Sequence, residues 1–137
     1  MDQNQSAKVS LWVIPEPLTV CRMHSLAGFS FEESFYFLGK TEEEISLVCP
    51  TAKVPVSGVE KREDGWRALK IEGELDFSLV GILAGLAGIL ADHGISIFAV
   101  STFNTDYVLV KETCLRKATE VLTQSGYIVT DTFRSNT

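Results

Sequence analysis

The stretch LDFSLVGILAGLAGILADHGISIFAVSTFNTDYVLV, residues 75–110, decides the fold of this chain. Between residues 77 and 91 it carries no charge, and its apolar side chains recur with helical spacing at six positions: Leu79, Ile82, Leu83, Leu86, Ile89 and Leu90. This spacing predicts a helix that buries one face in a core. A membrane span would need about 18–20 apolar residues, so the run is too short to cross a bilayer.

Strand and helix signals on both sides of this run complete one folding unit. Gly94 suits the left-handed backbone position that ends many helices. The expected elements in chain order are strand 66–72, helix 78–92, strand 95–100, the turn 104–106, strand 107–110, a helix capped by Thr113 and ended by Gly126, and strand 127–129. The order β-α-β-β-α-β is typical of an α+β, ferredoxin-like fold, in which two helices cover one face of a four-stranded antiparallel sheet.

The N-terminal half is strand-rich and has no counterpart of the apolar helix. Strands are expected at 9–13 and 18–23 around a proline corner, then at 34–38 and 45–49, with one helical turn at 41–44 from its capping-box spacing. Residues 51–64 are the most loop-like region, and we place the domain boundary there. We predict two units, residues 1–62 and residues 63–137. The first unit is about as long as a second copy of the C-terminal unit would be, although no sequence repeat is visible.

Composition narrows the class of protein. The chain has 45% hydrophobic and 22% charged residues and a formal net charge of -6, which indicates a globular domain and disfavours a nucleic-acid surface. Its three cysteines are far apart, which argues against a disulfide framework. Residues 1–7 are polar and contain no apolar signal-peptide core. We therefore expect a cytoplasmic protein with reduced thiols that binds neither nucleic acid nor a membrane.

The start of the apolar helix is the first candidate binding site. Its backbone N–H groups have no partner within the helix, and together with the helix dipole they form a seat for a carboxylate. The alternative is that Asp76 or Ser78 acts as a simple helix cap. Glycines at Gly81, Gly85 and Gly88 each cost the helix about 0.5–1 kcal/mol relative to alanine, so they imply close approach of a ligand, the sheet or a partner helix.

Polar residues between the two strands after the helix form the second candidate site. They are Ser101, Thr102, Asn104, Thr105 and Asp106. Asn, Thr and Asp are ordinary turn residues, so the segment needs no function beyond its turn. As a binding site it would supply hydroxyl and amide groups and one carboxylate that can pair with an ammonium group.

Catalytic and metal-binding patterns are weak. Cys21 and His24 have ligand-like spacing, but zinc needs three or four ligands and no second pair lies nearby. We find no Ser/His/Asp order, glycine-rich phosphate loop or pair of carboxylates. The sequence therefore predicts no enzyme, no metal and no cofactor.

Three segments together resemble an ACT domain: 75–84, 94–98 and 101–110. Within that family they are most similar to the aspartokinase-like subfamily, which includes the CASTOR-type arginine sensors. The front half, with 12–15 and 45–50, resembles the N-terminal ACT-like half of small two-unit members of this subfamily. The fold implied is a pair of ACT-like units in tandem.

ACT domains are regulatory modules that bind small ligands, usually amino acids, at interfaces between two ACT units. The resemblance implies a ligand site here that is lined by Asp76, Ser78, Val80, Gly81, Ile82, Leu83, Gly94, Ile95, Ser96, Ser101, Thr102, Asn104, Thr105 and Asp106. We expect a non-enzymatic homodimer that binds an amino acid. The alternatives are a protein interaction module without a small ligand, and a small ferredoxin-like enzyme, which lacks a recognisable catalytic set.

Overall fold

The computed structural model describes residues 9–72 and 79–131 of the chain. The chain forms two compact units: unit 1 comprises Met1–Pro15 and Arg67–Thr137, and unit 2 comprises Glu16–Trp66. One strand, β5 (Val59–Glu72), contributes its first part to unit 2 and its last part to unit 1. This division differs from the boundary expected between residues 62 and 63, because the first strand of the chain pairs with C-terminal strands.

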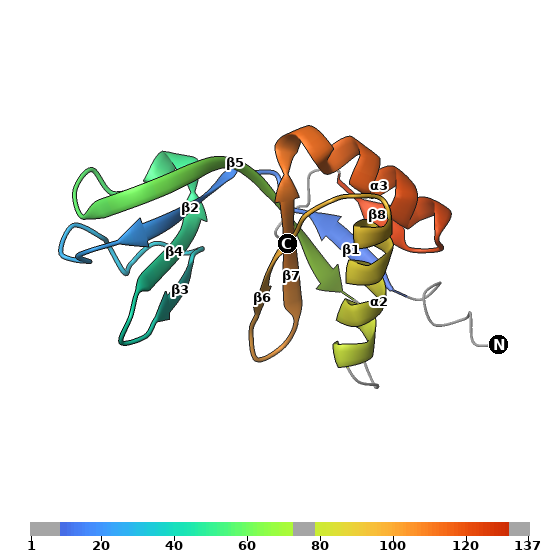
Figure 1. Cartoon of the computed structure of the whole chain (residues 1–137), viewed down its shortest axis with the longest axis horizontal. Coiled ribbons are helices and arrows are strands. Elements are labelled where there is room, and N and C mark those ends of the chain that lie inside the picture. The colour runs from blue at the N-terminus through green and yellow to red at the C-terminus, as the bar shows by residue number, and fades with distance from the viewer. Residues whose placement is uncertain (1–8, 73–78, 132–137) are drawn as a thin grey trace. The chain divides into compact units, whose positions relative to one another are not determined.

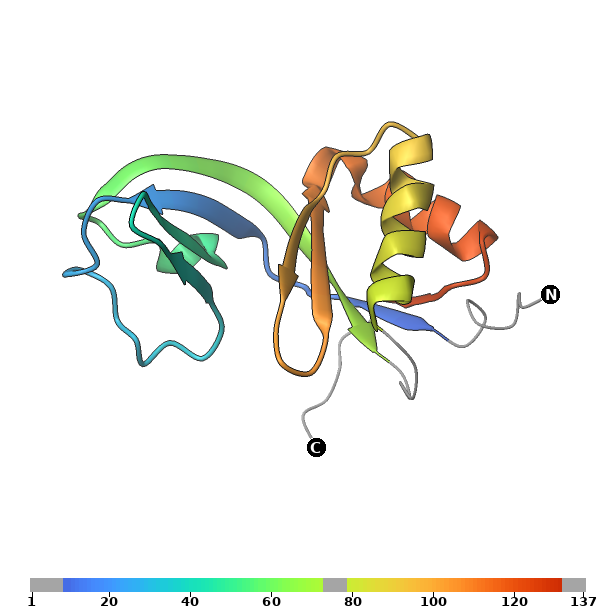
Figure 2. The same cartoon turned by 60° about the horizontal axis from the view of Figure 1, so that its bottom comes forward.

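Unit 1 has the expected α+β, ferredoxin-like order of elements. Its elements besides β5 are β1 (Ser10–Val13), α2 (Leu79–Asp92), β6 (Phe98–Ser101), β7 (Asp106–Lys111), η2 (Glu112–Cys114), α3 (Leu115–Gln124) and β8 (Ile128–Thr130). Figure 1 and Figure 2 both show α2 and α3 on one face of the sheet. The fold class predicted from the sequence is confirmed.

The sheet of unit 1 contains one strand more than predicted. Among the described residues the strand order is β6-β7-β5-β1-β8, with β1 antiparallel to β5 and parallel to β8. β1 joins this sheet because Leu11 and Val13 are both buried, at 0% and 2% exposure, while Ser10 and Trp12 are partly exposed. Their side chains alternate as a strand requires and join the core of unit 1.

The apolar stripe of α2 packs into that core as the spacing predicted. Leu86 and Leu90 are fully buried, and they share a cluster with Val108 and Val110 of β7. Burying such side chains stabilises the fold by roughly 1.5–3 kcal/mol each. Neither described helix is long and apolar enough to cross a membrane.

The helix ends follow the glycine signals but not the predicted cap. Gly94 has a φ of +73° and Gly126 a φ of +101°, so both glycines end their helices as predicted. The expected cap at Thr113 is wrong, because η2 covers that residue and Cys114 occupies the N-cap without a side-chain hydrogen bond. β6 also begins three residues later than expected, since Ile95 N–H still donates to the Leu90 carbonyl at 3.0 Å.

Unit 2 is built from strands, and residues 16–66, all of which the structure describes, contain no α-helix. Its elements are β2 (Leu18–Met23), β3 (Phe37–Lys40), β4 (Ile45–Pro50), η1 (Thr51–Lys53) and the start of β5. The strands lie in the order β3-β4-β2-β5 and pair antiparallel. One side of this sheet holds a small core of Cys21, Met23, Phe29, Leu47 and Cys49.

Two expectations for unit 2 are wrong. Residues 41–44 form the turn between β3 and β4 and no helical turn, because Thr41 N–H donates to the Glu44 carbonyl at 2.9 Å. The Thr41 hydroxyl also accepts hydrogen bonds from the backbone of Glu43 and Glu44, so the capping-box spacing serves a tight turn. The predicted loop 51–64 ends at Val59, where β5 begins with five exposed charged residues that resemble a loop in composition.

Candidate functional site

The turn between β6 and β7 is closed by two threonines. Thr102 N–H donates to the Thr105 carbonyl at 2.8 Å, and the Thr102 hydroxyl donates to the same oxygen at 2.9 Å. In return, Thr105 N–H donates to the Thr102 hydroxyl oxygen at 3.2 Å. These three bonds fix the backbone on both sides of Asn104.

A buried hydrogen bond joins this turn to β5. The hydroxyl of Thr105 donates to the Ile71 carbonyl at 2.6 Å. Asp106 follows as the first residue of β7, pairs with Ser101 across the ladder and is only 6% exposed. A carboxylate held at the edge of a protein interior in this way is costly to desolvate, and it attracts a cationic partner.

The structure brings the turn and the start of α2 to the same end of unit 1. Both views show the β6–β7 turn beside the end of the sheet at which α2 begins (Figure 1, Figure 2). Ser101, Thr102 and Asn104 are exposed there, whereas Thr105 and Asp106 are buried. This end therefore offers solvent-facing hydroxyl and amide groups next to one nearly buried carboxyl group.

The predicted residues of α2 contribute in different ways. Gly81 is exposed, and no atom of the described residues outside its own helix backbone lies within 4 Å of the position that a Cβ would occupy. Ile82 is buried and Leu83 partly buried, so their side chains belong to the core and only their backbone faces the helix start. Val80 is described through its backbone alone, and Asp76 and Ser78 lie outside the described residues.

The predicted residues Gly94, Ile95 and Ser96 lie at the other end of α2. The helix has 14 residues, and at 1.5 Å per residue it separates its two ends by about 21 Å. Ile95 is 4% exposed and part of the core, while Gly94 and Ser96 are exposed. Within one copy of unit 1, this group does not meet the β6–β7 turn.

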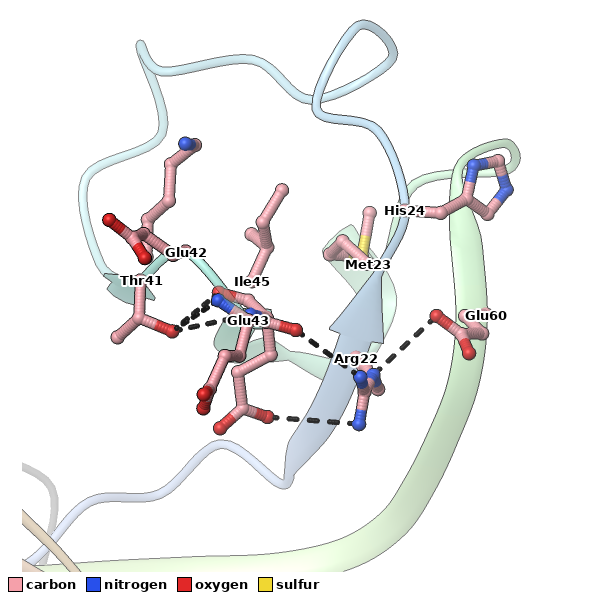
Figure 3. A pocket seen from close by; sticks show the side chains of 10 residues that line it. Arg22, Met23, His24, Thr41, Glu42, Glu43, Ile45 and Glu60 are labelled. Atoms are coloured by element: carbon pink, nitrogen blue, oxygen red, sulfur yellow. Dashed lines mark hydrogen bonds and ion pairs between the residues drawn. The ribbon is translucent and has the colours of Figure 1, made fainter.

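Unit 2 contains a hollow of about 310 Å³ that sequence reasoning missed. It is lined by the ends of β2 and β3, the turn between β3 and β4, and the start of β5, through Arg22, Met23, His24, Lys40, Thr41, Glu42, Glu43, Glu44, Ile45 and Glu60. Arg22 forms ion pairs of 4.0 Å with Glu44 and 3.5 Å with Glu60. Figure 3 shows the side chains of Arg22 and Glu60 facing each other. The run Glu42–Glu44 is the feature of the sequence that could indicate this acidic hollow. The same run also has the spacing of a helix start, which is how we interpret it from the sequence alone.

The Cys21 and His24 pair does not form a metal site with neighbouring ligands. Cys21 is buried and His24 exposed, and the described part of the chain holds no cluster of three or more His, Cys, Asp or Glu side chains suited to a metal. Burial raises the pKa of the Cys21 thiol, and burial together with the neighbouring Cys21 raises the pKa of Cys49 to about 11. Both thiols are therefore protonated near neutral pH.

A family model described as an ACT domain matches residues 61–124. The chain carries an ACT domain. This identification agrees with the βαββαβ order of unit 1 and confirms the family expected from residues 75–110. ACT domains form a regulatory family.

Curated proteins that are similar to this chain include arginine sensors. The human protein named "Cytosolic arginine sensor for mTORC1 subunit 1" is 45% identical over 58 residues, which cover 42% of this chain and 18% of the human protein. The chain thus spans less than a fifth of the length of the curated relatives that it matches.

Solved structures extend the likeness beyond the matched ACT residues. A crystal structure of a protein from Agobacterium tumefaciens has a TM-score of 0.82 and 25% identity, and the match covers 95% of this chain and 98% of that one. Aspartate kinase from Clostridium acetobutylicum has a TM-score of 0.59 and 13% identity over 85% of this chain and 34% of the kinase. At such low identity the kinase match shows the fold alone.

Proposed function

We propose that this chain is a non-enzymatic regulatory protein that binds an amino acid at an interface between its ACT domain and a second ACT unit. The observation that carries the proposal is the buried Asp106 at the end of the β6–β7 turn, held in place by the Thr105 to Ile71 hydrogen bond. The human relative, whose name describes an arginine sensor, supports the ligand class. Its name also supports a cytoplasmic location for this chain.

The chemistry of an amino acid suits the two groups at this end of unit 1. The N–H groups of the first turn of α2, which have no partner within the helix, would be donors for the α-carboxylate of the ligand. Asp106 is the acceptor for its ammonium group, and such charge-assisted hydrogen bonds are among the stronger ones in proteins. The exposed Ser101, Thr102 and Asn104 then surround the ligand with further polar contacts.

The position of the third predicted group favours a site shared between two ACT units. Gly94, Ile95 and Ser96 lie about 21 Å from the start of α2, given the 14 residues of the helix. A second copy that presents this end of its own α2 would add the group missing from the first. We therefore propose a homodimer with two-fold symmetry, the commonest arrangement for such assemblies.

A thermal-shift screen with the free amino acids tests the ligand proposal. A ligand at about 100 times its dissociation constant should stabilise the protein by roughly 2.7 kcal/mol. Sedimentation equilibrium, with and without the amino acid that gives the largest shift, tests the dimer. A protein that no amino acid stabilises, and that stays monomeric at every concentration, contradicts both parts of the proposal.

One observation favours the alternative of a protein interaction module without a small ligand. The three helical glycines Gly81, Gly85 and Gly88 are all exposed. Among the described residues outside the helix backbone, only Gly85 of these three has a neighbour within 4 Å of the position that a Cβ would occupy: the Tyr127 hydroxyl, at 3.6 Å. Packing of α2 on its own sheet therefore does not explain the three glycines. Packing of an element of a protein partner on α2 would explain them. Replacing Gly88 by leucine should abolish such packing without affecting an amino-acid site at the helix start.

A further inference from the structure

The outer strand of unit 2 has an open edge. β3 pairs with β4 alone among residues 16–66, all of which the structure describes. Beyond that ladder, no hydrogen bond of Leu38, Gly39 or Lys40 is found in the described part of the chain. At Gly39, no atom of the described residues other than its two chain neighbours lies within 4 Å of the position that a Cβ would take. An open edge of this kind is a template for pairing with a further strand.

Apolar side chains are exposed on and just before this strand. Phe31 is 54% exposed, although its ring packs edge-on against Phe29 at 5.2 Å and Tyr36 at 6.4 Å between centroids. Leu38, on β3 itself, is 37% exposed. Rings that are held by their neighbours and also exposed provide rigid contact area for a partner at little entropic cost.

The hollow shown in Figure 3 begins where β3 ends, because Lys40 is the last residue of β3 and also lines the hollow. Its lining contains four glutamates against one arginine and one lysine, a formal balance of -2. Arg22 is already neutralised by ion pairs with Glu44 and Glu60. Glu42 and Glu43 have no ion-pair partner among the described residues, so the hollow retains an uncompensated negative charge.

We propose that the open edge of β3 binds an extended, basic segment of a protein partner, which adds as a further strand and places a lysine or arginine side chain in the acidic hollow. The backbone of the segment would pair with β3, and its apolar side chains would contact Phe31 and Leu38. The negative hollow repels the phosphates of nucleic acids and anionic lipids. A second copy that pairs through this same edge is also disfavoured, because it would bring its own acidic hollow, with a formal balance of -2, next to this one.

Fluorescence polarisation with a labelled octapeptide of alternating valine and arginine tests this proposal. We expect saturable binding that weakens as salt is added, and no binding of the matched valine and glutamate peptide. A third peptide has the valine and arginine sequence with alternate backbone nitrogens methylated, so that it cannot complete a ladder. It should bind at least about tenfold more weakly, a difference typical of lost backbone hydrogen bonds. Equal binding of the methylated peptide overturns strand addition.

The location of the site is tested by two matched variants and by amide NMR. Glu42→Lys should weaken binding of the valine and arginine peptide about tenfold. Glu120→Lys, an exposed change on α3 of unit 1, alters the net charge equally and should have no effect. Amide shifts on titration should move at Leu38–Lys40 and in the turn after them. The proposal is overturned if the two variants weaken peptide binding equally, or if the amide shifts are confined to β6. It is also overturned if self-association of the chain displaces the peptide.

Discussion

The side-chain hydroxyl of Thr105 donates a buried hydrogen bond of 2.6 Å to the backbone carbonyl of Ile71. This bond ties the β6–β7 turn to the end of β5, and so it fixes the strand that starts with Asp106. Hydrogen bonding of this kind, from a turn to a neighbouring strand, positions side chains more firmly than the turn alone.

Replacing Thr105 by valine should lower the free energy of unfolding by about 1–3 kcal/mol. Valine has nearly the same shape but leaves the Ile71 carbonyl without its donor, and a buried unsatisfied carbonyl carries that penalty. Urea denaturation followed by circular dichroism measures the change. Thr123→Val is the matched control, because the Thr123 hydroxyl bonds an exposed helix carbonyl and its loss should cost less.

Asp106→Asn should weaken binding of the amino acid found by thermal shift about 10- to 100-fold. Asparagine keeps the size of the side chain and its place in the ladder but removes the charge that pairs with an ammonium group. Calorimetry of parent and variant with the same ligand gives the comparison. An unchanged affinity, or a variant that no longer folds, would make Asp106 a residue of the fold only.

Leu86→Ala should lower the free energy of unfolding by about 2–5 kcal/mol, because Leu86 is fully buried in the core of unit 1 and truncation leaves a cavity. Gly88→Ala on the exposed side of the same helix is the matched control. It should stabilise the protein by about 0.5–1 kcal/mol, since its new methyl group meets no atom of the described residues within 4 Å outside the helix's own backbone. Both values come from urea denaturation, and the same sign for the two variants would contradict the assigned helix face.

Stability should fall between pH 9 and pH 11 because of Cys49. Burial raises the pKa of its thiol from 9.0 to about 11. The unfolded chain releases this proton above pH 9 while the folded chain retains it until about pH 11, so rising pH favours unfolding. A shift of this size corresponds to roughly 2–3 kcal/mol.

The alkaline effect is measured by urea denaturation at pH 8 and pH 10.5 on the parent and on Cys49→Ala. The variant should lose less stability than the parent across this interval. Burial also raises the pKa of Tyr107 and Tyr127, but both tyrosines are present in both proteins and cancel in the comparison. Parallel pH profiles would show that Cys49 is not the group responsible.

Local signals in the sequence predict unit 1 well, because its elements depend on short-range patterns. The apolar stripe around Leu86 requires a helix, and Gly94 and Gly126 adopt backbone angles that favour glycine. The place of β1 between β5 and β8 depends on contacts between residues more than 50 positions apart, such as Ser10 with Glu72. No periodicity within a short window contains that information.

The candidate site and unit 2 were less predictable for physical reasons. The charged start of β5 resembles a loop, because its side chains face solvent and do not alternate with buried ones. Thr41 offers its hydroxyl to backbone N–H groups two and three residues later, which happens both in helix caps and in tight turns. The 310 Å³ hollow is lined by residues of four strands, β2, β3, β4 and β5, so only the tertiary structure reveals it.

The pairing of β1 with β5 has a consequence for any attempt to dissect this molecule. Ile14 N–H donates to the Ala68 carbonyl at 2.9 Å, so the chain leaves unit 1 and returns to it at adjacent points. Unit 2 is in this sense an insertion, and a short linker from Pro15 to Arg67 could replace it. A fragment cut at residue 61, where the family match begins, would instead lose a central strand and expose the flanks of β5 and β8.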